Sequence, residues 1–199
     1  MVVRAIVFCI LACLMGGCRD VGRQPYGRRM VLCLHSVDIS SLGGLLARET
    51  VGGACELAGD KLAGAMGLYA NPSNLIYFAE RVSDRKKMLA FRDEMKSKGA
   101  SEVGFVQLSF GSISEVLGAG SVCVRQELFY RVVDVKGKIL LSAAARAEGS
   151  RKYRNSGKDR EKVVTEMVLS GVDRMLDEAA RRICEFCDGR TIEERRDEE

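Results

Sequence analysis

Two cysteines near the end of the chain, Cys184 and Cys187, have the spacing at which thiols carry out disulfide exchange. In redox proteins with this motif, the reactive thiol gains a low pKa from the N-terminal end of a helix. Here the pair falls near the C-terminal end of a helix expected over 159–187, where the helix dipole disfavours a thiolate. We therefore interpret it as a structural pair, either packed thiols or a labile local disulfide, rather than a thiol-redox centre. Serine at both positions is expected to leave folding intact.

The other residue types offer little for catalysis. His35 is the only histidine, and a lone histidine lacks the partners of a catalytic triad or a zinc site, so a structural role in its strand is favoured. Gly59 is followed by Asp60-Lys61-Leu62 rather than by the residues of a phosphate loop. We expect no enzymatic activity, no cofactor and no metal.

The N-terminus resembles the signal of bacterial lipoproteins. Arg4 is followed by an apolar run over 5–15 and by Gly16, Gly17 and Cys18, after which the chain turns polar. This predicts a signal peptide over 1–17, lipid attachment at Cys18 and a tether over 18–29. Acyl chains on Cys18 would then hold the protein to a membrane. Cys13 is a competing attachment site, and an ordinary secretory signal or a single membrane anchor is the alternative.

Composition predicts one globular domain over 30–187, followed by a charged tail over 188–199. Hydrophobic residues are 47% of the chain and charged residues 29%, as in ordinary globular proteins. The formal net charge is +4, and loss of Arg4 with the signal would lower it to +3. A net positive charge this small argues against binding to nucleic acid.

Beyond Cys18, an odd number of cysteines leaves at least one thiol unbridged within one chain, and their connectivity stays open. These cysteines are Cys33, Cys55, Cys123, Cys184 and Cys187.

The stretch 121–149 predicts the central hairpin of the fold. Its first half alternates apolar with polar residues, which is the period of a strand with one buried face. The apolar set is Val122, Val124, Leu128, Tyr130 and Val132. Asp134 and Gly137 have the residue types of a tight turn. The return strand repeats the alternation with Ile139, Leu141, Ala143, Ala145 and Ala147.

Further strands and helices flank this hairpin. Strands are expected at 30–37, 75–82 and 103–114, the first of them apolar on both faces. Helices are expected at 42–69, 84–98 and 159–187. The glycines of the first helix favour a break near Gly52 and Gly53, and a basic loop is expected over 150–158. The fold class is thus α/β (α+β): one mixed, mostly antiparallel sheet packed by about three helices, in the order β-α-β-α-β-β-β-α. Burial is expected for Leu128, Tyr130, Leu141, Val168 and Met175.

With this element order, the turn at 134–137 and an Ala/Arg-rich closing helix, the chain resembles a group of envelope proteins. They are the curli-secretion lipoprotein CsgG, the LpoB-type activators of peptidoglycan synthases and the amino-terminal domain of TolB. The hairpin of that group carries an Asp-x-x-Thr-Gly-like turn, in which Lys136 here takes the place of the threonine. The likeness covers about 30–187. LptE-like lipopolysaccharide-assembly lipoproteins also share a lipid anchor, a hairpin and a helical end, and are the alternative resemblance.

The resemblance and the signal together imply a non-enzymatic lipoprotein of the bacterial cell envelope, anchored in the outer membrane and facing the periplasm. It would act by contacts with other envelope proteins, in envelope assembly, in secretion or in regulating a cell-wall synthase. A lipid or lipopolysaccharide carrier is the alternative. Self-association into a homo-oligomer stays open.

Overall fold

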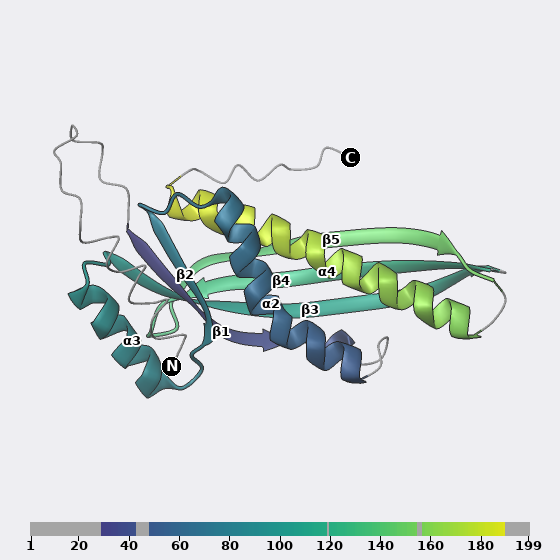
Figure 1. Cartoon of the computed structure of the whole chain (residues 1–199), viewed down its shortest axis with the longest axis horizontal. Helices are drawn as coiled ribbons and strands as arrows, with labels where there is room; N and C mark the ends of the chain where they lie inside the picture. Colours follow the sequence, from purple (N-terminus) through teal and green to yellow (C-terminus); the bar gives the residue numbers. More distant parts are fainter. Residues whose placement is uncertain (1–28, 43–47, 119, 155–156, 190–199) are drawn as a thin grey trace.

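The computed structural model describes residues 29–42, 48–118, 120–154 and 157–189. The predicted signal peptide, Cys18 and nearly all of the tether lie outside these residues, as does most of the predicted tail. The elements, shown in Figure 1, are β1 (Met30–Asp38), the 3₁₀ helix η1 (Ser40–Leu42), α2 (Arg48–Tyr69), β2 (Leu75–Arg81), α3 (Arg85–Ser97), β3 (Glu102–Gly118), β4 (Ser121–Val133), β5 (Ile139–Lys152) and α4 (Gly157–Cys187).

The strands form one mixed sheet in the order β2-β1-β3-β4-β5. β1 runs parallel to both of its neighbours, because α2 and α3 carry the chain back before each of the next two strands begins. The meander from β3 through β5 is antiparallel, and its two ladders are the longest in the sheet. The predicted class and element order are therefore confirmed.

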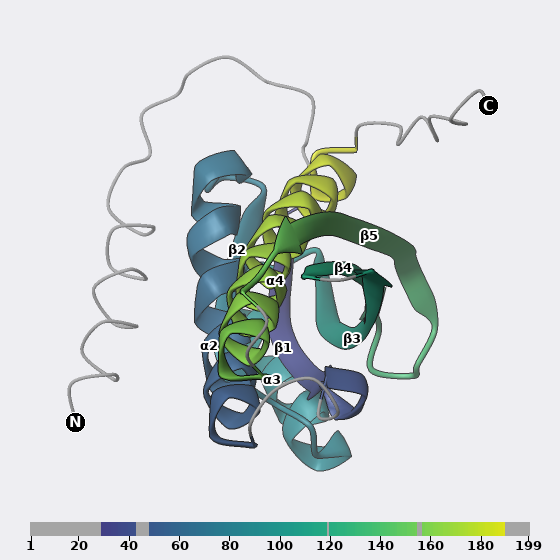
Figure 2. The same cartoon turned by 90° about the vertical axis from the view of Figure 1, so that its right-hand side faces the viewer.

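Two hydrophobic clusters lie on opposite faces of this sheet. α2 and α4 cover one face together, as Figure 2 shows, and α4 packs along β4 and β5. α3 covers the other face only around β1, β2 and the first part of β3. β1 is therefore enclosed on both sides, and its residues from Met30 to Leu34 are all at most 4% exposed. The expected burial is confirmed for Leu128, Tyr130, Leu141, Val168 and Met175.

The turn between β4 and β5 uses the predicted residues. The Asp134 carboxylate accepts hydrogen bonds from the backbone N–H groups of Lys136 and Lys138, both at 2.8 Å. Gly137 has a φ of +85°, a conformation that glycine adopts without steric cost. The expectation that Ile139 lies on the buried face is wrong, because the register between the strands shifts at this end and leaves Ile139 51% exposed.

Three other expectations are corrected. α2 continues through Gly52 and Gly53 without a break, since packing against α4 outweighs the low helix propensity of glycine. β3 runs past residue 114 to Gly118, and β5 runs to Lys152 where a loop was expected. β4 lies between these two extensions and pairs with both of them. The inter-strand hydrogen bonds therefore stabilise strands where the sequence alone predicts a loop or a turn.

Helix α3 begins and ends at the expected signals. The Asp84 side chain accepts hydrogen bonds from the backbone N–H groups of Lys86 and Lys87, so it satisfies donors that have no partner within the helix. Gly99, with a φ of +89°, follows the last turn. Met88 and Met95 face the sheet and are buried.

One polar contact fixes α4 on the sheet. Gln126 points from β4 into the core and is only 5% exposed. Its Nε2 donates a hydrogen bond to the Val168 carbonyl of α4 at 2.9 Å. A Cβ atom at Gly171 would lie 1.3 Å from the Gln126 Oε1, so only glycine leaves room for the amide.

Replacing Gly171 with alanine should lower the free energy of unfolding by about 1–3 kcal/mol, because the added methyl group overpacks this contact. Adding Gln126→Ala to that variant should recover part of the loss, since it removes the atoms that clash. Urea unfolding followed by circular dichroism measures both effects.

Gly64 in α2 is the matched control, because a Cβ there meets nothing within 4 Å. Gly64→Ala should raise the stability by up to about 1 kcal/mol through helix propensity alone. If Gly171→Ala were also stabilising, the close approach of Gln126 to α4 would be refuted.

Candidate interaction surface

The face of β3, β4 and β5 that points away from α4 carries no covering helix among the described residues. We call it the open face. On β3 it comprises Gly111 and Glu115, on β4 Arg125, Glu127, Phe129 and Arg131, and on β5 Ser142, Ala144, Arg146 and Glu148. α3 stops short of this region, so the polar half of the alternating pattern faces solvent here.

A hollow of about 460 Å³ lies on the open face. Charged side chains surround the hollow, and the hollow is deeper at Gly111 because glycine has no side chain there. Ser41 of η1 closes one side. The residues that line the hollow are Ser41, Gly111, Ser112, Arg125, Gln126, Glu127, Arg146, Ala147 and Glu148. The lining thus combines four charged side chains with apolar surface, so the hollow offers a partner both charges and hydrocarbon contact.

Ion pairs connect the charges of the open face across the strands. Arg125 Nε lies 3.2 Å from Glu148 Oε1, and Arg146 Nε lies 2.8 Å from Glu127 Oε1. Each pair joins residues directly opposite in the β4–β5 register. Arg125 also approaches Glu115 on β3 at 3.4 Å. Exposed pairs of this kind contribute only about 0–1 kcal/mol each, so their arrangement matters more for recognition than for stability.

Large apolar side chains are also exposed on or beside this surface. Phe129 is 49% exposed at the centre of β4. Val116 and Leu117, 51% and 56% exposed, lie at the tip of the β3–β4 hairpin. Aromatic side chains surrounded by charges are typical of protein-binding surfaces.

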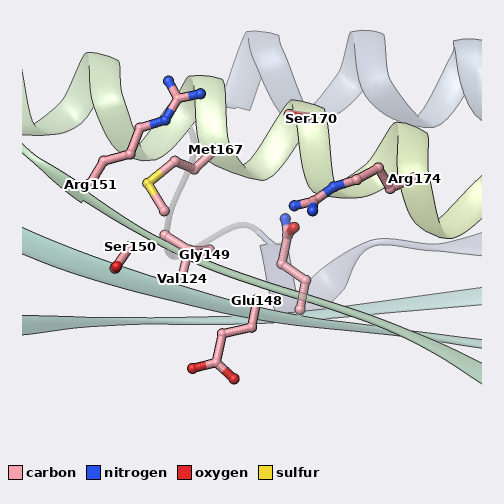
Figure 3. A pocket seen from close by; sticks show the side chains of 9 residues that line it. Val124, Glu148, Gly149, Ser150, Arg151, Met167, Ser170 and Arg174 are labelled. Atoms are coloured by element: carbon pink, nitrogen blue, oxygen red, sulfur yellow. The ribbon is translucent and has the colours of Figure 1, made fainter.

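A second cavity lies on the helix side of the sheet, between β5 and α4. Its volume is about 70 Å³, room for water rather than for an organic ligand. Figure 3 shows Met167 and Arg174 above the strands and Glu148 on the opposite side of them. Arg151 closes one end and forms an ion pair with Glu166 at 3.4 Å. The cavity brings together no pair of groups suited to proton transfer or nucleophilic attack.

Cys184 and Cys187 lie in the core, 3% and 1% exposed, and both side chains are thiols. Cys184 Sγ faces the Met66 carbonyl at 3.8 Å, and Cys187 Sγ faces Met30 Sδ at 3.3 Å. Burial raises the pKa of Cys187 from 9.0 to about 12, the reverse of what a reactive thiol needs. The expected packing as thiols agrees with this geometry, while a local disulfide stays a prediction. Cys18 and the side chain of Cys55 lie outside the described residues.

His35 lies on β1, at the irregularity where the pairing with β3 shifts. Its carbonyl accepts a hydrogen bond from Arg81 Nε at 3.2 Å. Burial, and next the nearby Arg81 charge, lower the pKa of the His35 imidazole, so it is neutral at pH 7. Nowhere in the described ranges do three His, Cys, Asp or Glu side chains gather as metal ligands.

The sequence identified the charges of the open face only as the polar half of a strand. It did not indicate that Ser41 and Gly111 would complete a hollow with them, since these residues are far apart in the chain. The alternation over 121–149 was the one available signal. Among the helices described, none combines the length and the apolar character needed to cross a membrane.

No protein-family model matches the chain, and no curated protein sequence matches it. Among solved structures, the chain is similar to a minor lipoprotein from Acinetobacter baumannii, with 12% identity over 83% of this chain and 96% of that one and a TM-score of 0.42. It is also similar to the rare lipoprotein B from Shewanella oneidensis (10% identity, 78% and 91% covered, TM-score 0.40) and to the hypothetical protein CT253 from Chlamydia trachomatis (11%, 81% and 99%, TM-score 0.47). Identities and TM-scores this low do not say what the chain does. Membership of the CsgG, LpoB and TolB group stays a prediction.

The buried thiol of Cys187 predicts a loss of stability at alkaline pH. Above the ordinary pKa of 9.0 the thiol ionises in the unfolded chain, but it stays protonated in the folded chain up to about pH 12. The unfolded state therefore binds fewer protons, and stability falls as pH rises through this window.

Cys187→Ala should make that decline shallower by up to about 1.4 kcal/mol per pH unit. Urea unfolding at several values above pH 9, compared with the parent chain, measures the difference. Ser170→Ala, an exposed change on the same helix, should keep the slope of the parent. Equal slopes for parent and Cys187→Ala would show that the thiol is accessible to water.

Proposed function

We propose that the chain is a non-enzymatic lipoprotein of the bacterial cell envelope that binds another envelope protein through its open face. The charged hollow beside an exposed Phe129 is the observation that carries this proposal. Such a surface offers both an apolar contact and charges that orient a partner. The partner would belong to an envelope assembly or secretion machine, or be a cell-wall synthase, with the protein held at the outer membrane and facing the periplasm.

The position of Arg29 limits how far the domain could lie from an anchor at Cys18. Arg29 directly precedes β1, and its carbonyl accepts hydrogen bonds from the backbone N–H and the Oγ of Ser101. The eleven Cα–Cα steps from Cys18 to Arg29 could span at most about 40 Å. An anchored chain of this length would keep the domain close to the membrane while leaving it free to turn toward a partner.

The charges around the hollow on the open face argue against the lipid-carrier alternative, although part of the lining is apolar. The lining contains Arg125, Glu127, Arg146 and Glu148, and bringing an acyl chain against these groups would cost their hydration. The thiol-redox alternative conflicts with the raised pKa of Cys187. Protein binding is therefore the function that the geometry supports best.

Replacing Cys18 with alanine should abolish acyl labelling and release the protein from membranes, since several acyl chains supply the anchoring energy. Radiolabelled palmitate incorporation and membrane fractionation measure both effects. Cys13→Ala is the control, because Cys13 is the competing attachment site, and it should leave labelling unchanged. Labelling that is lost in Cys13→Ala and kept in Cys18→Ala would move the anchor to Cys13.

Filling the hollow should block partner binding without disturbing the core. A Cβ at Gly111 has only the Glu127 carbonyl within 4 Å, at 3.8 Å, so a tyrosine there can be accommodated and would occupy the hollow. Crosslinking in cells followed by mass spectrometry should show envelope partners of the parent that are depleted at least about tenfold in Gly111→Tyr, the loss expected when an interface centre is obstructed.

Lys162→Tyr adds the same side chain at an exposed position of α4, on the other side of the sheet from the open face, and should retain those partners. Unfolding curves of both variants establish that the fold is kept. The same set of partners for parent and Gly111→Tyr would reject the hollow as the binding site.

A further inference from the structure

The outer edge of β5 has no pairing strand among the described residues. β5 is fourteen residues long and ends the strand order. Figure 1 shows it along the border of the sheet, with α4 lying in front of the sheet rather than along that border. Half of its backbone N–H and C=O groups therefore point outward, as they do on any edge strand.

The side chains on this edge differ from the usual protection against edge pairing. Natural edges often carry charges of one sign or a proline, which repel or obstruct a second strand. β5 has no proline, and its basic residues Arg151 and Lys152 lie at its end. At its middle it carries Arg146 and Glu148, two residues apart on the same exposed face and opposite in charge. Two identical strands that pair antiparallel are related by a twofold axis, so a residue before the axis lies opposite a residue after it. Two opposite charges at this spacing therefore attract each other across the axis.

We propose that two copies of this chain pair through β5, antiparallel, with the twofold axis at Ala147. The two five-stranded sheets then join into one continuous sheet. Arg146 of each copy lies opposite Glu148 of the second copy. This association uses a different feature from the lipid anchor and does not depend on it.

The pairing of β4 with β5 within each copy extends the alternation of positive and negative side chains over four strands. Within one copy, Arg125 lies opposite Glu148 and Glu127 opposite Arg146. With the axis at Ala147, one row across the joined sheet reads Arg125, Glu148, then Arg146 and Glu127 of the second copy. Every neighbour in the row has the opposite sign, and the symmetry-related row repeats the pattern. Arg146 and Glu148 thus each have an opposite charge on both sides.

No neighbouring register gives this match. An axis at Arg146 or at Glu148 would place that charge opposite itself, which is repulsive. An axis at Gly149 would place Arg146 opposite Lys152, and an axis at Ala145 would leave Arg146 opposite Ala144. A shift that exchanges the two faces of the strand would move Ala145 and Ala147 out of the core.

The rest of the strand is compatible with the register. On the side of α4 the residues nearest the axis are small, with Ala147 opposite its own copy and Ala145 opposite Gly149. Toward the strand ends, Arg151 faces Ala143 and Lys152 faces Ser142, so the basic ends of the two strands stay apart. The exposed Ile139 lies beyond the paired region.

Charge reversal with complementation tests the pairing. Arg146→Glu gives a strand with two acidic residues, and Glu148→Arg gives one with two basic residues, so each variant repels its own copy. A mixed pair restores both contacts. The full chain is produced with two different affinity tags in the same cells, extracted in mild detergent and captured through one tag, and the second tag is quantified.

The parent should be co-captured, each single variant should be co-captured about tenfold less, and the mixture of the two variants should return to within about twofold of the parent. Because the mixture contains the same variant chains, its recovery also shows that they fold. Arg131→Glu, the same charge change on β4 away from the edge, should pair like the parent. Acyl labelling should be unchanged throughout, so failure here is separate from failure of the anchor.

A crosslink tests the register. Ser142 and Lys152, both exposed, lie opposite each other across the proposed axis, within the Cα separation that a disulfide can bridge. Mixing Ser142→Cys with Lys152→Cys under mild oxidation should give a disulfide-linked dimer that neither variant gives alone. A parent that is not co-captured, single variants that pair as well as the parent, or a mixture that fails to recover would each overturn the proposal.

Discussion

Because α4 packs against only one face of β4 and β5, the two faces of these strands have different environments, and most properties of the molecule follow from this difference. The contact is held by apolar burial along α4 and by the Gln126 amide, which reaches the Val168 carbonyl past Gly171. A buried amide without its partner would be costly, so this hydrogen bond favours one position of the helix along the strands. The remaining charges of β4 and β5 are consequently left together on the open face.

The other end of the sheet is built differently. Around β1 both faces are covered, by α2 and α4 on one side and by α3 on the other, and consecutive residues are buried. This end is a three-layer core that holds the parallel strands, whereas the meander end is a two-layer structure with one exposed face. The buried thiols of Cys33 and Cys187 belong to the core end, where burial raises both pKa values to about 12. The surfaces available for recognition belong to the meander end.

The proposed roles of the meander end are compatible with one another. The hollow lies on the open face, and the edge of β5 lies beside it, with Arg146 and Glu148 common to both. Two copies joined at β5 would present two hollows on one continuous face, related by the twofold axis. A partner with two copies of its own binding site would gain from this arrangement, since the second contact forms at a high effective concentration.

Local patterns in the sequence were sufficient for the element order, the 134–137 turn, the Asp84 cap and the buried stripe of α4. In each of these, the signal and the structure lie within a few residues of one another, as with the carboxylate of Asp134 and the N–H groups that it accepts. The signal peptide and Cys18 were likewise inferred from sequence alone. The tertiary structure decided the features that depend on distant segments: the continuity of α2 through Gly52 and Gly53, the full lengths of β3 and β5, and the exposure of Ile139. It also decided the hollow, because Ser41, Gly111 and the β4–β5 charges meet only when the sheet is assembled and α4 has taken the opposite face.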